Sequence, residues 1–342
     1  MVRAPNWVGD VVMATPAFRA LRQAFPEAHL AVVLRPYVEP ILRGAPWFDE
    51  VVALEDRGAR NFAAVVARLR RGRFDLGLVL PNSFRTALEF FLGGVRRRVG
   101  YERRRRAVLL TDPIPAPRDE NGRFVPQNMV DYYLRLCQAV GCEDLSQREE
   151  LFITPECQRR ADALLEKWAI GPEDLLVGVN PGGAFGSSKL WLPERFARVA
   201  DTLAERHGAR VILFGAPSER PILQAVAEAM KTAPILPEAG DVDLDVLKPL
   251  MRRCCLLVTN DTGARHYAVA FGVPVVCVMG STSPLYTNVN LERQAIVRVD
   301  VDCGPCQKKV CTTDHRCMTL ITPEMVLEAA ERLLSRFPPR GR

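Results

Sequence analysis

The chain has 342 residues, a formal net charge of +6 and 48% hydrophobic residues, values typical of a soluble globular protein of about two domains. Each domain can bury a core large enough to need no disulfide staples. Asp10 interrupts the first apolar stretch, so we expect no signal peptide. The longest apolar stretch, residues 268–279, falls well short of the ~18 residues that a membrane span needs. We therefore expect a cytosolic protein.

Short apolar segments alternate with amphipathic helical patterns in the first half of the chain. Residues 10–25, for example, place Val11, Phe18 and Leu21 on one helical face. The predicted elements are a helix at 10–25, strands at 30–34, 50–54 and 76–80, helices at 62–71, 84–92 and 127–140, and a proline-rich loop at 111–125. This alternation predicts a parallel sheet covered by helices.

The second half repeats this scheme after Thr154-Pro155-Glu156, a helix start with proline at its first position. Strands are predicted at 175–179, 210–214, 234–236, 256–259 and 273–278, with helices beginning near Pro193, Pro217 and Asp243 and a last helix at 325–337. We therefore divide the chain into two α/β domains, 1–153 and 154–321, and a terminal helical segment, 322–342.

Positive charge is concentrated between Arg57 and Arg106, where fourteen arginines stand against three acidic residues, a local charge of +11. One interpretation is a solvated, arginine-rich face. The other is a surface for a polyanion, either nucleic acid or phosphorylated lipid at a membrane. Aromatic residues are sparse in this stretch, which disfavours a base-stacking surface, so no nucleic-acid partner is expected.

Four of the ten cysteines form the pattern Cys303-x2-Cys306-x4-Cys311-x5-Cys317, with His315 inside it. This spacing is compatible with a structural zinc site, with two disulfides or with four reduced thiols. Disulfides are the least expected of the three in a cytosolic chain. If zinc is bound, four protein ligands leave no open position, so the site would pin the loop before the last helix.

Two later strand ends carry groups suited to binding an anion. The first, residues 180–189, combines Gly182, Gly183 and Gly186 with Ser187, Ser188 and Lys189. Glycines permit close backbone approach, and the hydroxyls and the ammonium group are donors to phosphate. The pattern is neither a Walker loop nor a Rossmann fingerprint, and the plain alternative is an ordinary glycine-rich turn.

The second strand end is Asn260-Asp261-Thr262-Gly263, followed by His266. Thr262 and Gly263 can offer N–H groups at a helix N-terminus, whose dipole favours phosphate. Asp261 is either part of this site or a helix cap, and His266 is either directed at the same anion or structural.

Asp10 follows Gly9 at the first strand end. It is either a helix N-cap or a catalytic base for a hydroxyl nucleophile. A carboxylate in one half and anion sites in the other suggest group transfer.

Taken together, these segments resemble the lipopolysaccharide heptosyltransferases of glycosyltransferase family 9. The resemblance runs in the same order along the whole chain and rests on the segments 5–10, 80–84, 181–183 with Lys189, 191–193, and 260–263 with His266. It implies a GT-B fold: two Rossmann-like, doubly wound parallel-sheet domains facing across a cleft, with the terminal helix crossing back to the first. Relatives usually carry a longer first strand than residues 2–4 provide.

The resemblance also implies the reaction. Heptose would pass from ADP-L-glycero-β-D-manno-heptose to the first heptose of the lipopolysaccharide inner core, with inversion and no covalent intermediate. The first domain would bind the lipid A–core acceptor at the inner face of the cytoplasmic membrane, and the second would bind ADP-heptose. No cofactor is needed for the chemistry, and no oligomeric state follows from the sequence.

Motif positions assign the residues. Asp10 would be the general base and Lys189 would act on the departing ADP. Donor-binding residues would be Gly182, Gly183, Ser187, Ser188, Glu219, Asp261, Thr262, Gly263 and His266, with Glu219 on the ribose. Acceptor-binding candidates are Asn6, Asn82, Ser83, Arg97 and Arg104. The alternatives are a family 9 transferase with another acceptor and a non-catalytic polyanion-binding protein, which should not bind ADP.

Overall fold

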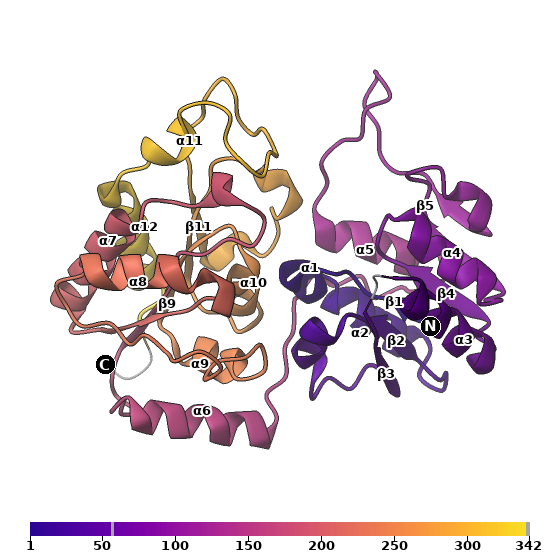
Figure 1. Cartoon of the computed structure of the whole chain (residues 1–342), viewed down its shortest axis with the longest axis horizontal. Helices are drawn as coiled ribbons and strands as arrows, with labels where there is room; N and C mark the ends of the chain where they lie inside the picture. Colours follow the sequence, from indigo (N-terminus) through magenta and orange to yellow (C-terminus); the bar gives the residue numbers. More distant parts are fainter. Residues whose placement is uncertain (56–57, 340–342) are drawn as a thin grey trace. The chain divides into compact units, whose positions relative to one another are not determined.

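The computed structural model describes residues 1–55 and 58–339, so Arg57 of the arginine run lies outside the described residues. The chain forms two compact units (Figure 1). The first comprises Met1–Phe152 with Leu285–Val289, and the second comprises Ile153–Pro284 with Asn290–Arg342. The division after Phe152 falls one residue before the predicted one. The short segment Leu285–Val289, which belongs to the first unit, was not predicted.

The first unit is built on a six-stranded parallel sheet with the order β3-β2-β1-β4-β5-β6. Its strands are β1 Val2–Arg3, β2 Ala31–Leu34, β3 Glu50–Ala53, β4 Leu76–Val79, β5 Arg97–Tyr101 and β6 Asp112–Ile114. The first strand pairs with both β2 and β4, so the order reverses direction at β1. Such a switch point places the loops after β1 and β4 side by side at the carboxyl edge of the sheet.

Helices cover both faces of this sheet (Figure 1). They are α1 Val8–Met13, α2 Thr15–Ala24, α3 Ala59–Gly72, α4 Phe84–Leu92 and α5 Met129–Gln138. The pair α3 and α4 places Val65, Leu69 and Phe90 against Val33 and Val79 of the sheet. Since α1, α2 and α5 contact one another, they form the second layer.

Three details of the first unit differ from the sequence prediction. The helix at 10–25 is two helices, because Thr15 and Pro16 start a new one after Ala14. Strand β5 was missed because Arg97 and Arg98 hide the apolar pattern of its buried end. Strand β6 lies within the predicted proline-rich loop, and Pro113 is tolerated there because β6 is an edge strand.

The second unit has a five-stranded parallel sheet with the order β11-β10-β9-β7-β8. Its strands are β7 Leu176–Asn180, β8 Arg210–Leu213, β9 Leu256–Asn260, β10 Val275–Val278 and β11 Gln294–Val297. The predicted strand at 234–236 is reduced to one bridge between Ile212 and Ile235, and β11 was not predicted. Because β7 and β9 are neighbours, the two predicted anion-binding strand ends lie next to each other.

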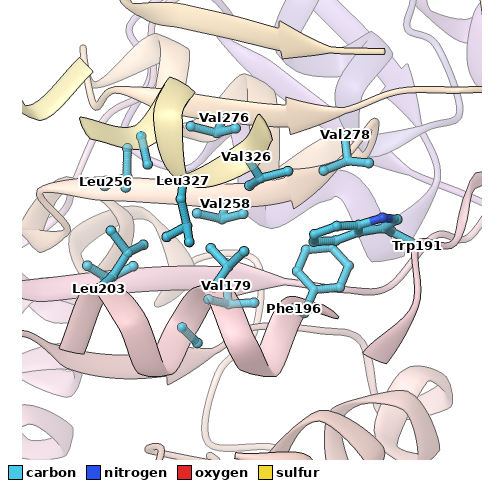
Figure 2. Close-up of a cluster of buried hydrophobic side chains, with 14 of the residues drawn as sticks. Val179, Trp191, Phe196, Leu203, Leu256, Val258, Val276, Val278, Val326 and Leu327 are labelled. Carbon is cyan, nitrogen blue, oxygen red and sulfur yellow. The ribbon is translucent and has the colours of Figure 1, made fainter. Parts of the chain in front are cut away.

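The helices of the second unit are α6 Pro155–Lys167, α7 Pro193–His207, α8 Arg220–Ala229, α9 Leu247–Arg253, α10 Gly263–Ala270, α11 Arg316–Thr319 and α12 Pro323–Arg336. Figure 2 shows the main core, in which Phe196 of α7 and Val326 of α12 meet Val258 and Val278 of the sheet. Trp191 packs edge-on against Phe196 with ring centroids 5.0 Å apart.

The crossing of the terminal helix back to the first domain stays a prediction, and the main contacts of this helix lie in the second unit. Helix α12 contacts α7 and strands β9, β10 and β11, all in the second unit. Its apolar stripe, with Val326, Ala330 and Leu333 buried, completes the core over that sheet.

Candidate functional site

Lys189 and Asp261 meet at the carboxyl edge of the second sheet. The loop after β7 ends in a 3₁₀ helix, Ser187–Lys189, while Asp261 directly follows β9 and precedes α10. The Lys189 Nζ lies 2.8 Å from the Asp261 carboxylate and donates to the Asp261 carbonyl oxygen at 2.9 Å. The ammonium group is therefore held beside the N-terminal end of α10.

Asp261 is a partly buried, ionised carboxylate. Besides Lys189, it accepts a hydrogen bond from the Thr282 hydroxyl at 2.8 Å and lies 3.4 Å from the Arg265 guanidinium. Burial acts to raise the pKa of this carboxyl, but the charges of Lys189 and Arg265 outweigh burial and hold the pKa at about 2. Asp261 is thus an anchor for two cations. It is not the N-cap of α10, because Thr262, the next residue, occupies that position.

Two buried asparagines that the sequence prediction did not assign fix the glycine-rich loop. The Asn260 side-chain amide donates to the carbonyl oxygens of Pro181 and Gly182 at 2.7 and 3.1 Å. Its side-chain oxygen accepts the backbone N–H of Trp191. Asn180 accepts the Thr262 hydroxyl at 3.1 Å. An asparagine ending each of two adjacent parallel strands is the signal that could have revealed this pairing.

Glu219 joins the same site through the backbone. Its two carboxylate oxygens accept the N–H groups of Gly183 at 2.6 Å and Ala216 at 2.8 Å. A Cβ atom at Gly182 would lie 2.3 Å from the Glu219 carboxyl carbon, so a side chain at position 182 would displace the Glu219 carboxylate. The structure therefore brings Glu219 to the glycine-rich loop, a contact that the sequence did not predict, and its contact with ribose stays a prediction.

The remaining predicted donor residues are divided between exposed and buried positions. Thr262 is the N-cap of α10 and Gly263 its first residue, while His266 is buried one turn further on. Ser187 is exposed. Ser188 is buried, and its hydroxyl forms hydrogen bonds with the Ser281 hydroxyl at 3.1 Å and with the Lys308 carbonyl. These hydrogen bonds stabilise the glycine-rich loop from inside the protein.

Asp10 lies in the first turn of α1. Trp7 is the N-cap of this helix, so the interpretation of Asp10 as the cap is wrong. The Tyr133 hydroxyl, from α5, is 3.2 Å from one Asp10 carboxylate oxygen. Burial, together with the negative charge of Asp10, raises the pKa of Tyr133 well above its ordinary value, so Tyr133 is a neutral donor that orients the carboxylate.

The structure brings only some of the predicted acceptor residues to Asp10's edge of the first sheet. Asn6 follows β1 and Asn82 follows β4, and these strands are neighbours. Asn82 is held by the Tyr132 hydroxyl at 3.1 Å and by Arg106 at 3.2 Å. Arg104 follows β5 and is exposed.

Arg97 does not belong to this group. It is the first residue of β5, at the amino edge of the sheet, opposite the edge that carries Asp10. There its guanidinium pairs with Asp112 at 2.9 Å and donates to the Ala139 carbonyl at 3.1 Å. The position of Arg97 therefore does not support its predicted contact with the acceptor.

Ser83 has a structural role. It is the N-cap of α4, and its hydroxyl accepts a hydrogen bond from the backbone N–H of Thr86 at 3.1 Å. We expect Ser83→Ala to lower the free energy of unfolding by about 1 kcal/mol, as is typical when a cap is lost. Thermal melting and acceptor KM, measured on Ser83→Ala and on the capping variant Ser83→Asp, check this. A raised KM in both variants with unchanged melting would instead assign Ser83 to the acceptor.

The arginine run is not one continuous surface. Arg106 is fully buried and donates to the Tyr101 carbonyl at 2.8 Å, and burial lowers its pKa to about 10. Arg68 pairs with Glu50, and Arg85 with Glu89. The exposed members include Arg70, Arg71, Arg73, Arg104 and Arg105. The charge available to a polyanion is therefore smaller than the sequence suggested.

All ten cysteines, every one in the described part of the chain, are free thiols, so the disulfide alternative is not supported. Cys303, Cys306, Cys311 and Cys317 line one cavity of about 50 Å³ with His315. Within residues 1–55 and 58–339, no three His, Cys, Asp or Glu side chains are preassembled as a metal site. The choice between zinc and reduced thiols thus depends on whether the thiols can close on an ion.

The chain belongs to glycosyltransferase family 9 (heptosyltransferase), whose model matches residues 62–317. It is 28% identical to lipopolysaccharide heptosyltransferase 2 of Escherichia coli K12, over 98% of each chain. It is also 28% identical to lipooligosaccharide heptosyltransferase 2 of Haemophilus ducreyi, over 98% of this chain and 99% of that one.

Two solved structures agree with this assignment. A family 9 glycosyltransferase from Veillonella parvula is 26% identical and gives a TM-score of 0.84, over 98% of this chain and 96% of that one. The E. coli ADP-heptose LPS heptosyltransferase II is 27% identical with a TM-score of 0.79, over 98% of both chains. The GT-B fold class and the glycosyltransferase class predicted from the sequence are confirmed.

No helix of the described residues is long and apolar enough to cross a membrane.

Proposed function

We propose that the chain transfers heptose from ADP-heptose to the first heptose of the lipopolysaccharide inner core. The observation that carries the proposal is the Lys189–Asp261 junction beside α10, where a cation and a helix N-terminus stand at adjacent strand ends. This is a suitable place for a diphosphate. The relatives of similar length that are named heptosyltransferase 2 support the choice of donor and acceptor.

Each unit supplies one half of the chemistry. In the first, the Asp10 carboxylate, oriented by Tyr133, takes the proton of the acceptor hydroxyl as its oxygen attacks the anomeric carbon of the heptose. The bond from that carbon to the ADP oxygen breaks, and ADP leaves with the bonding electrons. In the second unit, Lys189 and the α10 N-terminus stabilise the charge that develops on the diphosphate. Attack opposite the leaving group inverts the anomeric configuration.

The function is tested by ADP release from ADP-heptose with lipopolysaccharide cores truncated at successive sugars. We expect release with cores that end at the first heptose and none with cores that lack it. Release with a core lacking any heptose would instead indicate a different acceptor. Binding of ADP by titration separates both cases from a polyanion-binding protein, which should not bind ADP.

We also propose that the first unit contacts the anionic membrane that carries the acceptor. Exposed Arg104 and Arg105 follow β5, and exposed Phe91 and Val108 lie nearby, since α4 contacts the 3₁₀ helix Ala107–Leu109. The Arg98 guanidinium lies 5.4 Å from the Phe91 ring centre and donates to the Leu109 carbonyl. Apolar side chains among cations are typical of peripheral membrane contacts.

Vesicle co-sedimentation tests this contact. We expect binding to anionic vesicles at low salt that is lost near 1 M salt, where the screening length is ~3 Å. Arg104→Glu/Arg105→Glu should weaken binding, whereas Arg332→Glu, on the exposed face of α12 in the second unit, is the control and should not. Binding that ignores salt, or equal binding by both variants, would contradict the proposed contact.

A further inference from the structure

The cysteine loop, which we define as residues 302–317, links β11 to α12 in the second unit. Its four cysteines range from exposed Cys303 to buried Cys317 and surround one cavity. Lys308 and Arg316 line the same cavity. Four sulfur ligands from one short loop suit a thiophilic divalent cation.

This loop also holds the residue that precedes Lys189. The Ser188 N–H donates to the Lys309 carbonyl at 3.1 Å, and the Ser188 hydroxyl donates to the Lys308 carbonyl. On its other side, the Ser188 carbonyl oxygen lies 3.0 Å from His315 Nε2. Three separate contacts thus tie one buried residue of the glycine-rich loop to the cysteine loop.

The two loops are packed backbone against backbone. Gly186 has φ +155°, and a Cβ atom there would lie 2.2 Å from the Lys309 carbonyl oxygen. A side chain at position 186 would therefore force the loops apart. Since Lys189 N–H donates to the Gly186 carbonyl at 3.2 Å, any shift of residues 308–309 reaches the backbone of Lys189 within one hydrogen bond.

We propose that the four thiols of the cysteine loop bind one zinc-like cation, and that this binding fixes Ser188 and so places the Lys189 ammonium for the donor diphosphate. Because the thiols line a cavity without being preassembled, the ion draws the loop inward and releases the thiol protons to solvent. The ion has four protein ligands and no open position, so it takes no part in the transfer. Its influence on the reaction passes through the Ser188 contacts.

Metal content is the first measurement. Protein purified without chelator should contain about one zinc per chain, and Cys303→Ser/Cys306→Ser should contain none. Cys317→Ser should lose zinc and melting temperature together. Cys255→Ser, a half-buried thiol outside the loop, is the matched control and should keep its zinc. Wild-type protein that contains no zinc, and takes up none when zinc is added back, overturns the site.

ADP titration is the second measurement, and it rests on the proposed function. Removal of zinc should raise the Kd for ADP on the order of tenfold, as is usual for coupled sites, and zinc added back should restore it. Ser188→Ala should retain zinc yet weaken ADP binding. Zinc removal without any change in ADP affinity overturns the coupling. If neither form binds ADP, the proposed donor site fails, while the zinc content still decides the metal site.

Discussion

Asp10→Asn should lower kcat for heptosyl transfer by about 10²–10⁴-fold, the usual cost of losing a general base. The amide keeps the size of the carboxylate and its hydrogen bond with Tyr133, but it cannot take the proton of the acceptor hydroxyl. Initial rates at saturating ADP-heptose and acceptor measure the effect. Affinity for ADP should be unchanged, because the proposed diphosphate site lies in the second unit.

Two controls separate catalysis from structure at this position. Circular dichroism and melting temperature show whether the variant folds, since Asp10 also lies in the first turn of α1, where a carboxylate is favoured by the helix dipole. Tyr133→Phe removes the orienting hydroxyl and leaves the base, so its loss of rate should be much smaller. Near-normal turnover by folded Asp10→Asn would return Asp10 to a purely structural role.

The strand ends that carry chemistry were predictable, because glycine, asparagine and acidic residues follow apolar runs at residues 180, 260 and 10. The sequence could not predict, however, which of these strand ends lie next to each other in the sheet. Lys189 and Asp261 are 72 positions apart, and they meet only because β7 and β9 pair in the sheet. For the same reason, the sequence could not show that Arg97 starts its strand at the opposite edge.

Side-chain burial explains the other differences between the sequence predictions and the structure. In sequence, Arg106 is one more cation of a charged run, but it donates to backbone carbonyls inside the first unit. Ser188 follows Ser187, which suggests two equivalent hydroxyls, yet only Ser187 is exposed. The apolar stripe of the terminal helix is buried in the core of the second unit. Local pattern identifies the groups present, and tertiary packing decides which of them face a ligand.

Lys189→Ala should weaken ADP-heptose binding and lower kcat by on the order of 10²–10³-fold, the cost of removing one group that stabilises developing negative charge. In the structure, the ammonium is fixed by the carboxylate and carbonyl of Asp261. A lysine held in this way needs no rearrangement to meet the departing diphosphate. Titration with ADP and with ADP-heptose, together with single-turnover rates, measures binding and chemistry separately.

The variant also removes one of the cations that balance the partly buried Asp261 carboxylate, so folding has to be controlled. Arg265 and Thr282 remain on this carboxylate, and we expect a lower melting temperature but a folded protein. Lys189→Ala/Asp261→Asn removes the unbalanced charge and should regain stability without regaining rate. If the double variant regained the rate as well, the ammonium would act only on Asp261. Unchanged affinity and rate in the single variant would mean that Lys189 does not contact the diphosphate, because a cation lost from a charged ligand cannot be silent in both.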